Sequence, residues 1–142
     1  MTYPSIDLSI ALVLLRTILG VVFFMHGAQK VLGWFGGYGL KATIGHFKAN
    51  LHIPSQLGYL AAFVEFFGSI ALILGILTQP AAFGILVTMI VATLKVHGPA
   101  GFFLSTSDPK RGQGYEYSLT LGVLALVVVI LGGGAYSLDA VL

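Results

Sequence analysis

Four apolar segments dominate the sequence and limit what the chain can fold into. They cover residues 8–32, 57–77, 81–96 and 117–131. A helix needs about 20 apolar residues, and at least about 17, to cross the hydrocarbon core of a bilayer. The last two segments are near or below that limit, so we expect them to extend into their flanks or to lie where the bilayer is thin. Only 8% of the 142 residues are charged, against about 25% in soluble domains. The sequence therefore predicts an all-α membrane protein with four transmembrane helices in a bundle, forming one domain over residues 1–142.

The first apolar segment partly resembles a secretory signal peptide. Such a peptide carries its positive charge before the apolar region. Here no basic residue precedes the segment, and Arg16 lies inside it. We therefore expect a permanent helix.

The cations other than Arg16 lie in or beside two of the three predicted connections. Those of the first and third connections are Lys30, Lys41, Lys48, Lys95, Lys110 and Arg111. The N-terminus, the turn at residues 78–80 and the C-terminus carry none. Because connections rich in Lys and Arg stay in the cytoplasm, the sequence predicts that both termini are outside.

An amphipathic segment lies in the first connection. Its apolar residues recur at helical spacing, namely Leu40, Ile44, Phe47 and Leu51, while Lys41 and Lys48 fall on another side. This pattern predicts an interfacial amphipathic helix in the headgroup layer, with lysines that favour anionic lipid. A plain amphipathic cover on the bundle explains the same stripe, so both interpretations stay open.

Polar residues inside the first apolar segment share one helix face. At about 100° per residue, the stripe comprises Arg16, Gly20, Phe23, Gly27 and Lys30, with His26 about 80° to its side. Charge at depth in lipid is costly, so this face should turn toward the bundle interior or water. Glu65 of the second segment lies at a depth that the long Arg16 side chain can reach. We predict a buried ion pair between Arg16 and Glu65.

A second polar cluster is expected where three predicted helices begin or end on the cytoplasmic side. Its members are His26, Lys30, Lys95, His97, Tyr115 and Glu116. They can surround one polar pocket, or the lysines can extend to the membrane surface and complement helix C-termini. Two histidines are weak grounds for a haem between His26 and His97, so we predict no metal. The chain has no cysteine, so any redox role needs a bound cofactor or a partner subunit.

Short motifs run in a fixed order through nearly the whole chain. They are Arg16, Gly20, Phe24, His26-Gly27 and Lys30, then Glu65 with Gly68 and Gly75, the stretches HGPAGFF and GYEY, and the ending GGGAYSLD. In this order they resemble the DoxX family. The resemblance implies a small four-helix membrane protein, and the related DoxD subunit is associated with thiosulfate:quinone oxidoreductase. Family members often end in basic residues, whereas this chain continues into Ala140-Val141-Leu142.

Two functions remain open, both in a prokaryotic cytoplasmic (inner) membrane. In the first, the chain handles quinone within or beside a membrane oxidoreductase. The candidate ligand-binding residues are then Arg16, His26, Lys30 and His97, and the candidate proton relays are Glu65 and Glu116. In the second, the chain is a non-catalytic scaffold or accessory subunit. A small-solute transporter is less favoured, because the sequence lacks a pair of broken, half-length helices. The expected partners are membrane lipid and other protein subunits, with no nucleic acid.

Overall fold

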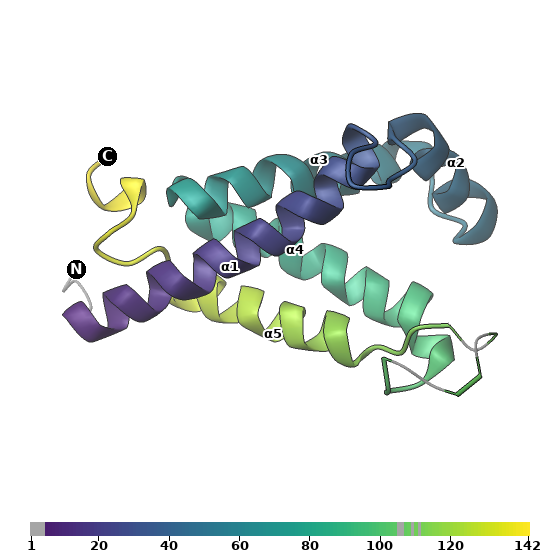
Figure 1. Ribbon diagram of the computed structural model, residues 1–142. Helices are drawn as coiled ribbons and strands as arrows, with labels where there is room; N and C mark the ends of the chain where they lie inside the picture. The colour runs from purple at the N-terminus through teal and green to yellow at the C-terminus, as the bar shows by residue number, and fades with distance from the viewer. Residues whose placement is uncertain (1–4, 105–106, 109, 111) are drawn as a thin grey trace.

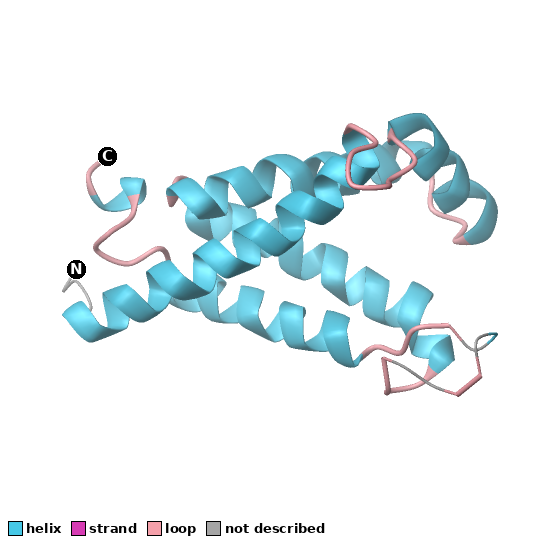
Figure 2. Ribbon diagram, viewed as in Figure 1, coloured by secondary structure: helices cyan, strands magenta, loops and turns pink. Residues whose placement is uncertain are grey.

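The computed structural model describes residues 5–104, 107–108, 110 and 112–142, and the regular secondary structure in these ranges is helical. The α-helices are α1 (Ile6–Val31), α2 (Leu40–Asn50), α3 (Ser55–Leu74), α4 (Thr78–Val91) and α5 (Glu116–Leu131). Short turns of other helix types are η1 (Ala92–His97), η2 (Gly98–Ala100) and η4 (Leu138–Ala140). Figure 2 shows these helices joined by loops, with no strand among the described residues. The predicted all-helical class is confirmed.

Three helical stretches are long and apolar enough to cross a membrane: Ile6–Val31, Ser55–Leu74 and Thr78–Ala100. The third is α4 extended by η1 and η2, so the third apolar segment does continue into its flank as expected. The fourth, α5, is apolar but has only 16 residues, fewer than the roughly 17 that a span needs. The crossing by α5 stays a prediction.

The helices form two pairs that diverge from one end of the molecule to the other (Figure 1). Helix α1 packs along α3, and α4 packs along α5, while α3 also contacts α4. The buried apolar core lies where the two pairs meet; its residues are Leu19, Phe23, Leu72, Ala82, Ile85, Met89, Leu121, Ala125 and Val128. The start of α1 and the C-terminus lie at the same end, and α2 lies at the other (Figure 1).

Glycines set how closely α1 approaches α3. A Cβ added to Gly27 would lie 2.7 Å from the Phe66 Cα, and one added to Gly20 would lie 2.9 Å from the Ser69 carbonyl oxygen. The two helices are antiparallel, because the later glycine of α1 contacts the earlier part of α3. Backbones this close allow extensive van der Waals contact, as at other small-residue helix interfaces.

Helix α2 packs its apolar stripe onto the start of α3. Ile44 is buried, and a Cβ added to Gly58 would lie 3.1 Å from Ile44 and 3.4 Å from Phe47. Lys41 and Lys48 are exposed. The stripe therefore covers protein, as in the second of the two interpretations, and its predicted position in the headgroup layer remains a prediction.

Candidate functional site

A cavity of about 780 Å³ lies between the two helix pairs, at the end away from the termini. Small-molecule sites typically measure roughly 300–1,000 Å³. Its walls are mostly apolar and come from every α-helix, with Phe23, Phe47, Leu60, Val87 and Leu121 as examples. The charged and histidine side chains among them are His26, Lys30, His52, Glu65, Lys95 and His97. An apolar space with a few polar groups fits an amphiphilic ligand better than a polar solute.

The most buried charged side chain of the cavity is that of Glu65, which forms an ion pair with Lys30. The Glu65 side chain is 7% exposed and the Lys30 side chain 24%. Lys30 lies in the last turn of α1, and the antiparallel register brings it beside the middle of α3. A carboxylate taken out of water needs a charged partner, and here the partner is a lysine with one side open to the cavity.

His26 lies one turn before Lys30 on α1 and lines the same cavity. Its side chain is exposed, so the ring contributes to the wall without being enclosed by packing. Along the wall, the ring lies near the Lys30–Glu65 ion pair, and its other side is open to the cavity. An imidazole in this position can donate or accept a hydrogen bond.

Lys95 and His97 lie on η1, a π-helical turn that continues α4. The Lys95 Nζ is 3.4 Å from the carbonyl oxygen of Leu51, at the C-terminus of α2. The His97 Nδ1 is 2.9 Å from the carbonyl oxygen of Gln113. Single π-helical turns inside α-helices are frequent at functional sites. Here the turn places two basic side chains at the rim of the cavity and links it to the segments on either side.

The connection between η2 and α5 folds back on itself beside this rim. Gly114 donates its backbone N–H to Phe103, and Glu116 donates to Phe102, at 3.0 and 2.9 Å. A Cβ at Gly114 would lie 2.2 Å from the Phe103 carbonyl oxygen, so only glycine fits. The stretches HGPAGFF and GYEY, far apart in the loop, are therefore neighbours in the fold.

The structure brings four of the six candidate residues to one cavity and leaves two elsewhere. His26, Lys30, Glu65 and His97 line it, whereas Glu116 and Arg16 do not. Lys95 of the expected polar cluster also lines the cavity, and Tyr115 does not. His52, an exposed residue after α2, is also part of the wall. In the described ranges, no three His, Asp or Glu side chains are grouped as a metal site would need.

The predicted ion pair between Arg16 and Glu65 is wrong. The Arg16 Nη1 donates to the carbonyl oxygens of Leu72 and Ile73, at 2.9 and 2.7 Å, and Nη2 donates to that of Tyr136 at 2.7 Å. Arg16 is 3% exposed. The last carbonyls of a helix have no partner within the helix and carry partial negative charge. Arg16 therefore caps the C-terminus of α3.

Helix register explains why Arg16 and Glu65 do not meet. Glu65 lies opposite Gly27 in the antiparallel pair, and Gly27 is 11 residues beyond Arg16 in the sequence. At 1.5 Å per residue the difference in depth is about 16 Å. The sequence places both charges on interior faces, and both are buried. The depths of Arg16 and Glu65, counted from approximate helix ends, were too uncertain to identify the partner of Glu65.

A further polar residue, Asp139, was missed by the sequence reasoning. Its carboxylate accepts the backbone N–H groups of Leu77 and Thr78, at 2.7 and 2.8 Å, at the start of α4. Burial acts to raise the pKa of Asp139, but the hydrogen bonds from Thr78 and Leu77 and the Arg16 charge outweigh it, so the pKa lies below its ordinary value. A residue 61 positions from the helix it caps gives no local capping pattern, so only the ending GGGAYSLD marked this segment.

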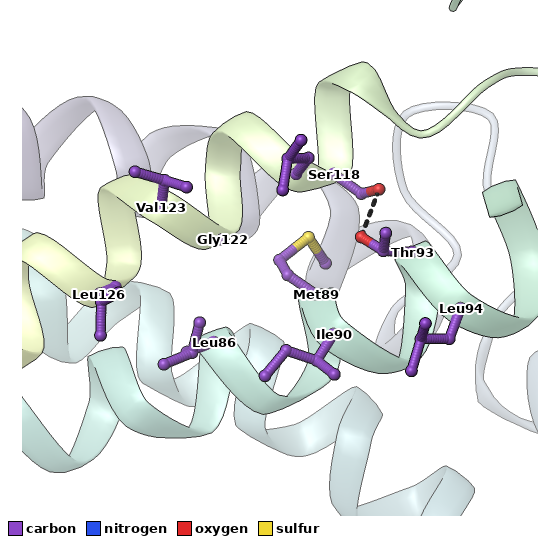
Figure 3. Close-up of a pocket in the computed structure, with 10 residues that line it drawn as sticks. Leu86, Met89, Ile90, Thr93, Leu94, Ser118, Gly122, Val123 and Leu126 are labelled. Atoms are coloured by element: carbon purple, nitrogen blue, oxygen red, sulfur yellow. Dashed lines mark hydrogen bonds between the residues drawn. The ribbon is translucent and has the colours of Figure 1, made fainter. Parts of the chain in front are cut away.

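A second hollow, of about 200 Å³, lies between α4 and α5. Figure 3 shows Leu86, Ile90 and Leu126 around it, with a hydrogen bond of 2.8 Å between the Thr93 and Ser118 hydroxyls. Those hydroxyls satisfy each other, and the rest of the wall is apolar. The hollow therefore offers a ligand no polar group to orient it, which the larger cavity does.

Three helices of membrane-spanning length and composition indicate a multi-pass helical membrane protein. It belongs to the DoxX family, whose family model matches residues 11–98. The matched residues include most of α1 and all of α3 and α4, and hence most of the cavity wall.

Three curated relatives are similar to the chain. An uncharacterized protein of Haemophilus influenzae is 32% identical over 130 residues, covering 90% of this chain and 87% of the relative. A Bacillus subtilis protein named "Putative oxidoreductase CatD" is 30% identical over 92 residues, covering 63% of each chain. A second uncharacterized protein of Haemophilus influenzae is 28% identical over 141 residues, covering 97% of this chain and 87% of the relative. No solved structure matches the chain.

Proposed function

We propose that this protein binds a quinone in the cavity between its helix pairs and presents it to a membrane oxidoreductase. The observation that carries the proposal is the composition of the cavity, about 780 Å³ of mostly apolar wall with the Lys30–Glu65 pair and His26 at one place. A quinone has a flat apolar body and two carbonyl oxygens that accept hydrogen bonds. Both parts match the wall.

The residues around the ion pair have complementary roles in this proposal. Lys30 and His26 donate hydrogen bonds that orient a quinone carbonyl, because both are donors at the wall of an otherwise apolar space. Glu65 holds Lys30 in position. It also acts as the proton relay, passing protons between Lys30 and the quinone carbonyl. Arg16 and Glu116, which do not line the cavity, have no part in binding. A bound quinone supplies the two-electron chemistry, and the electrons come from a partner subunit or a further cofactor.

The topology belongs to the same proposal. Helix α5 crosses as a fourth span where the bilayer is locally thin, both termini are outside, and the protein is in a prokaryotic cytoplasmic membrane beside other subunits. The printed name of the Bacillus subtilis relative, an oxidoreductase, supports a redox setting. Lipid contact follows from the many large apolar side chains exposed on α1, α3, α4 and α5.

Gentle purification followed by mass spectrometry of co-extracted molecules tests the proposal. Wild-type protein should retain quinone, and Lys30→Met should retain much less at the same amount of monodisperse protein. Lys41→Met is the matched control, because Lys41 is exposed on α2 and does not line the cavity. Absence of quinone from wild-type protein, together with stoichiometric protein partners, would instead favour the accessory-subunit function.

A further inference from the structure

The charges that line the cavity do not cancel. Two lysines, Lys30 and Lys95, and one carboxylate, Glu65, are among the lining residues. Glu65 is paired with Lys30. Within the described residues, Lys95 has no carboxylate within ion-pair distance. The cavity therefore has an excess positive charge before any contribution from its three histidines.

Lys95 is held only weakly by the protein. Its Nζ contacts the Leu51 carbonyl oxygen at 3.4 Å, longer than the usual 2.7–3.2 Å of an N–H···O hydrogen bond. The acceptor is a neutral backbone group, and the lysine side chain is exposed at the rim. A charged acceptor makes a hydrogen bond roughly twice as strong as a neutral one. A ligand anion can therefore replace the carbonyl as the partner of Lys95.

Lys30 and Lys95 belong to different helix pairs. Lys30 belongs to α1, in one helix pair, and Lys95 to η1, which continues α4 of the other pair. A flat ring between the pairs meets Lys30 and His26 on one side and Lys95 on the other. The first side is electrically balanced by Glu65 and suits a neutral carbonyl, whereas the second side is not balanced and suits an oxygen anion.

We propose that the cavity selects an acidic quinone, one with an ionised ring hydroxyl, and that Lys95 pairs with that oxygen. This inference rests on the proposed function, because it assigns a charge to the quinone bound in the same cavity. The hydroxyl of a hydroxyquinone is conjugated with a ring carbonyl, so it ionises as a carboxylic acid does. His52 and His97 lie on the wall with Lys95 and complete a basic rim.

Two probes of nearly the same size separate charge from shape. Lawsone is a hydroxynaphthoquinone that is anionic at neutral pH, and its O-methyl ether is neutral. Binding is measured by titration calorimetry on the full chain in lipid nanodiscs, with empty nanodiscs as the reference for partitioning into lipid. Wild-type protein should bind lawsone at least about tenfold more tightly than the ether, as expected for gaining one hydrogen bond between charged groups.

Variants then assign the preference to one side chain. Lys95→Gln should bind the two probes equally while keeping wild-type affinity for the ether, which shows that the cavity is intact. Lys95→Arg, which keeps the charge, should keep the preference, as should Lys48→Gln, whose lysine is exposed on α2 away from the cavity.

Each other outcome overturns a defined part of the argument. Equal binding of both probes to wild-type protein overturns the acidic-quinone inference and leaves quinone binding intact. A preference that survives in Lys95→Gln overturns the role of Lys95. Binding of neither probe above the level of empty nanodiscs overturns the proposed function itself.

Discussion

Basic residues of α1 contact α3 at two depths, and their surroundings differ. Near the termini, Arg16 is 3% exposed and donates to three backbone carbonyls. Toward the other end, Lys30 is 24% exposed, pairs with Glu65, and lines a cavity. The first cation is enclosed by backbone of α3 and of the C-terminal segment. The second is balanced by one carboxylate and is open on one side.

The difference separates a structural charge from a functional one. A buried guanidinium that donates to three backbone carbonyls ties two segments of the chain together. An ammonium beside a cavity can change partners without unfolding the chain. A polar face on a membrane helix therefore indicates that its side chains are buried inside the protein. Whether a buried charge is structural or can bind a ligand depends on whether it is enclosed by backbone or borders a cavity.

The largest expected effect is at the enclosed end. Arg16→Met removes three charge-assisted hydrogen bonds and leaves the last carbonyls of α3 without these donors. We expect a loss of about 3 kcal/mol or more in the free energy of unfolding. Lys30→Met should cost less, because Lys30 is partly exposed and Glu65, which loses its partner, borders the open cavity. Thermal unfolding and the monodisperse fraction of purified protein measure both, and equal losses would contradict the distinction between the two ends.

The next effect tests the close approach of α1 and α3. Gly27→Ala places a Cβ against the backbone of Phe66, at 2.7 Å from its Cα, so the helices must separate. Overpacking typically costs about 1–3 kcal/mol, whereas an alanine in place of glycine otherwise favours a helix by about 1 kcal/mol. Gly122→Ala is the control, since its Cβ would lie 3.5 Å from the Met89 Cβ. Stability measurements should show loss only for Gly27→Ala, and the same variant should weaken the Lys30–Glu65 contact.

A double-mutant cycle distinguishes the observed ion pair from the rejected one. Lys30→Met and Glu65→Gln should show a coupling energy of about 1 kcal/mol, because contacting residues are not additive. Arg16→Met and Glu65→Gln should be additive within about 0.5 kcal/mol, because their partners are separate and their depths differ. Measurable coupling between Arg16 and Glu65 would show that the two ends are not independent.

The smallest effect concerns Asp139 and depends on pH. Asp139→Ala removes the acceptor of two N–H groups at the start of α4, which should cost about 1 kcal/mol. The folded-state pKa of Asp139 is below the ordinary 3.8, so its contribution is present above that pH and is lost as the pH falls through the lower folded value. Unfolding curves of wild type and variant should therefore differ at neutral pH and converge under acid. A constant difference at all pH values would show that the carboxylate charge is not involved.

Hydropathy was enough to predict the helical membrane class and which faces turn inward. Arg16, Gly20, Phe23 and Gly27 are buried as the helical period requires. The same reasoning placed a cluster of six polar residues at one end; four of them, His26, Lys30, Lys95 and His97, line the cavity, whereas Tyr115 and Glu116 do not. The direction in which a side chain points follows from spacing along its own helix. The collection of side chains at one end follows from the order in which the predicted helices cross the membrane.

The choice of partners was decided only by the tertiary structure. Whether Glu65 meets Arg16 or Lys30 depends on the register of two antiparallel helices, which the contacts of Gly20 and Gly27 set. The roles of Tyr136 and Asp139 depend on a C-terminal segment that folds back over helix ends more than 60 residues away in sequence. Periodicity determines the direction of a side chain around its own helix, but the depth at which it meets another helix comes from packing across the interface.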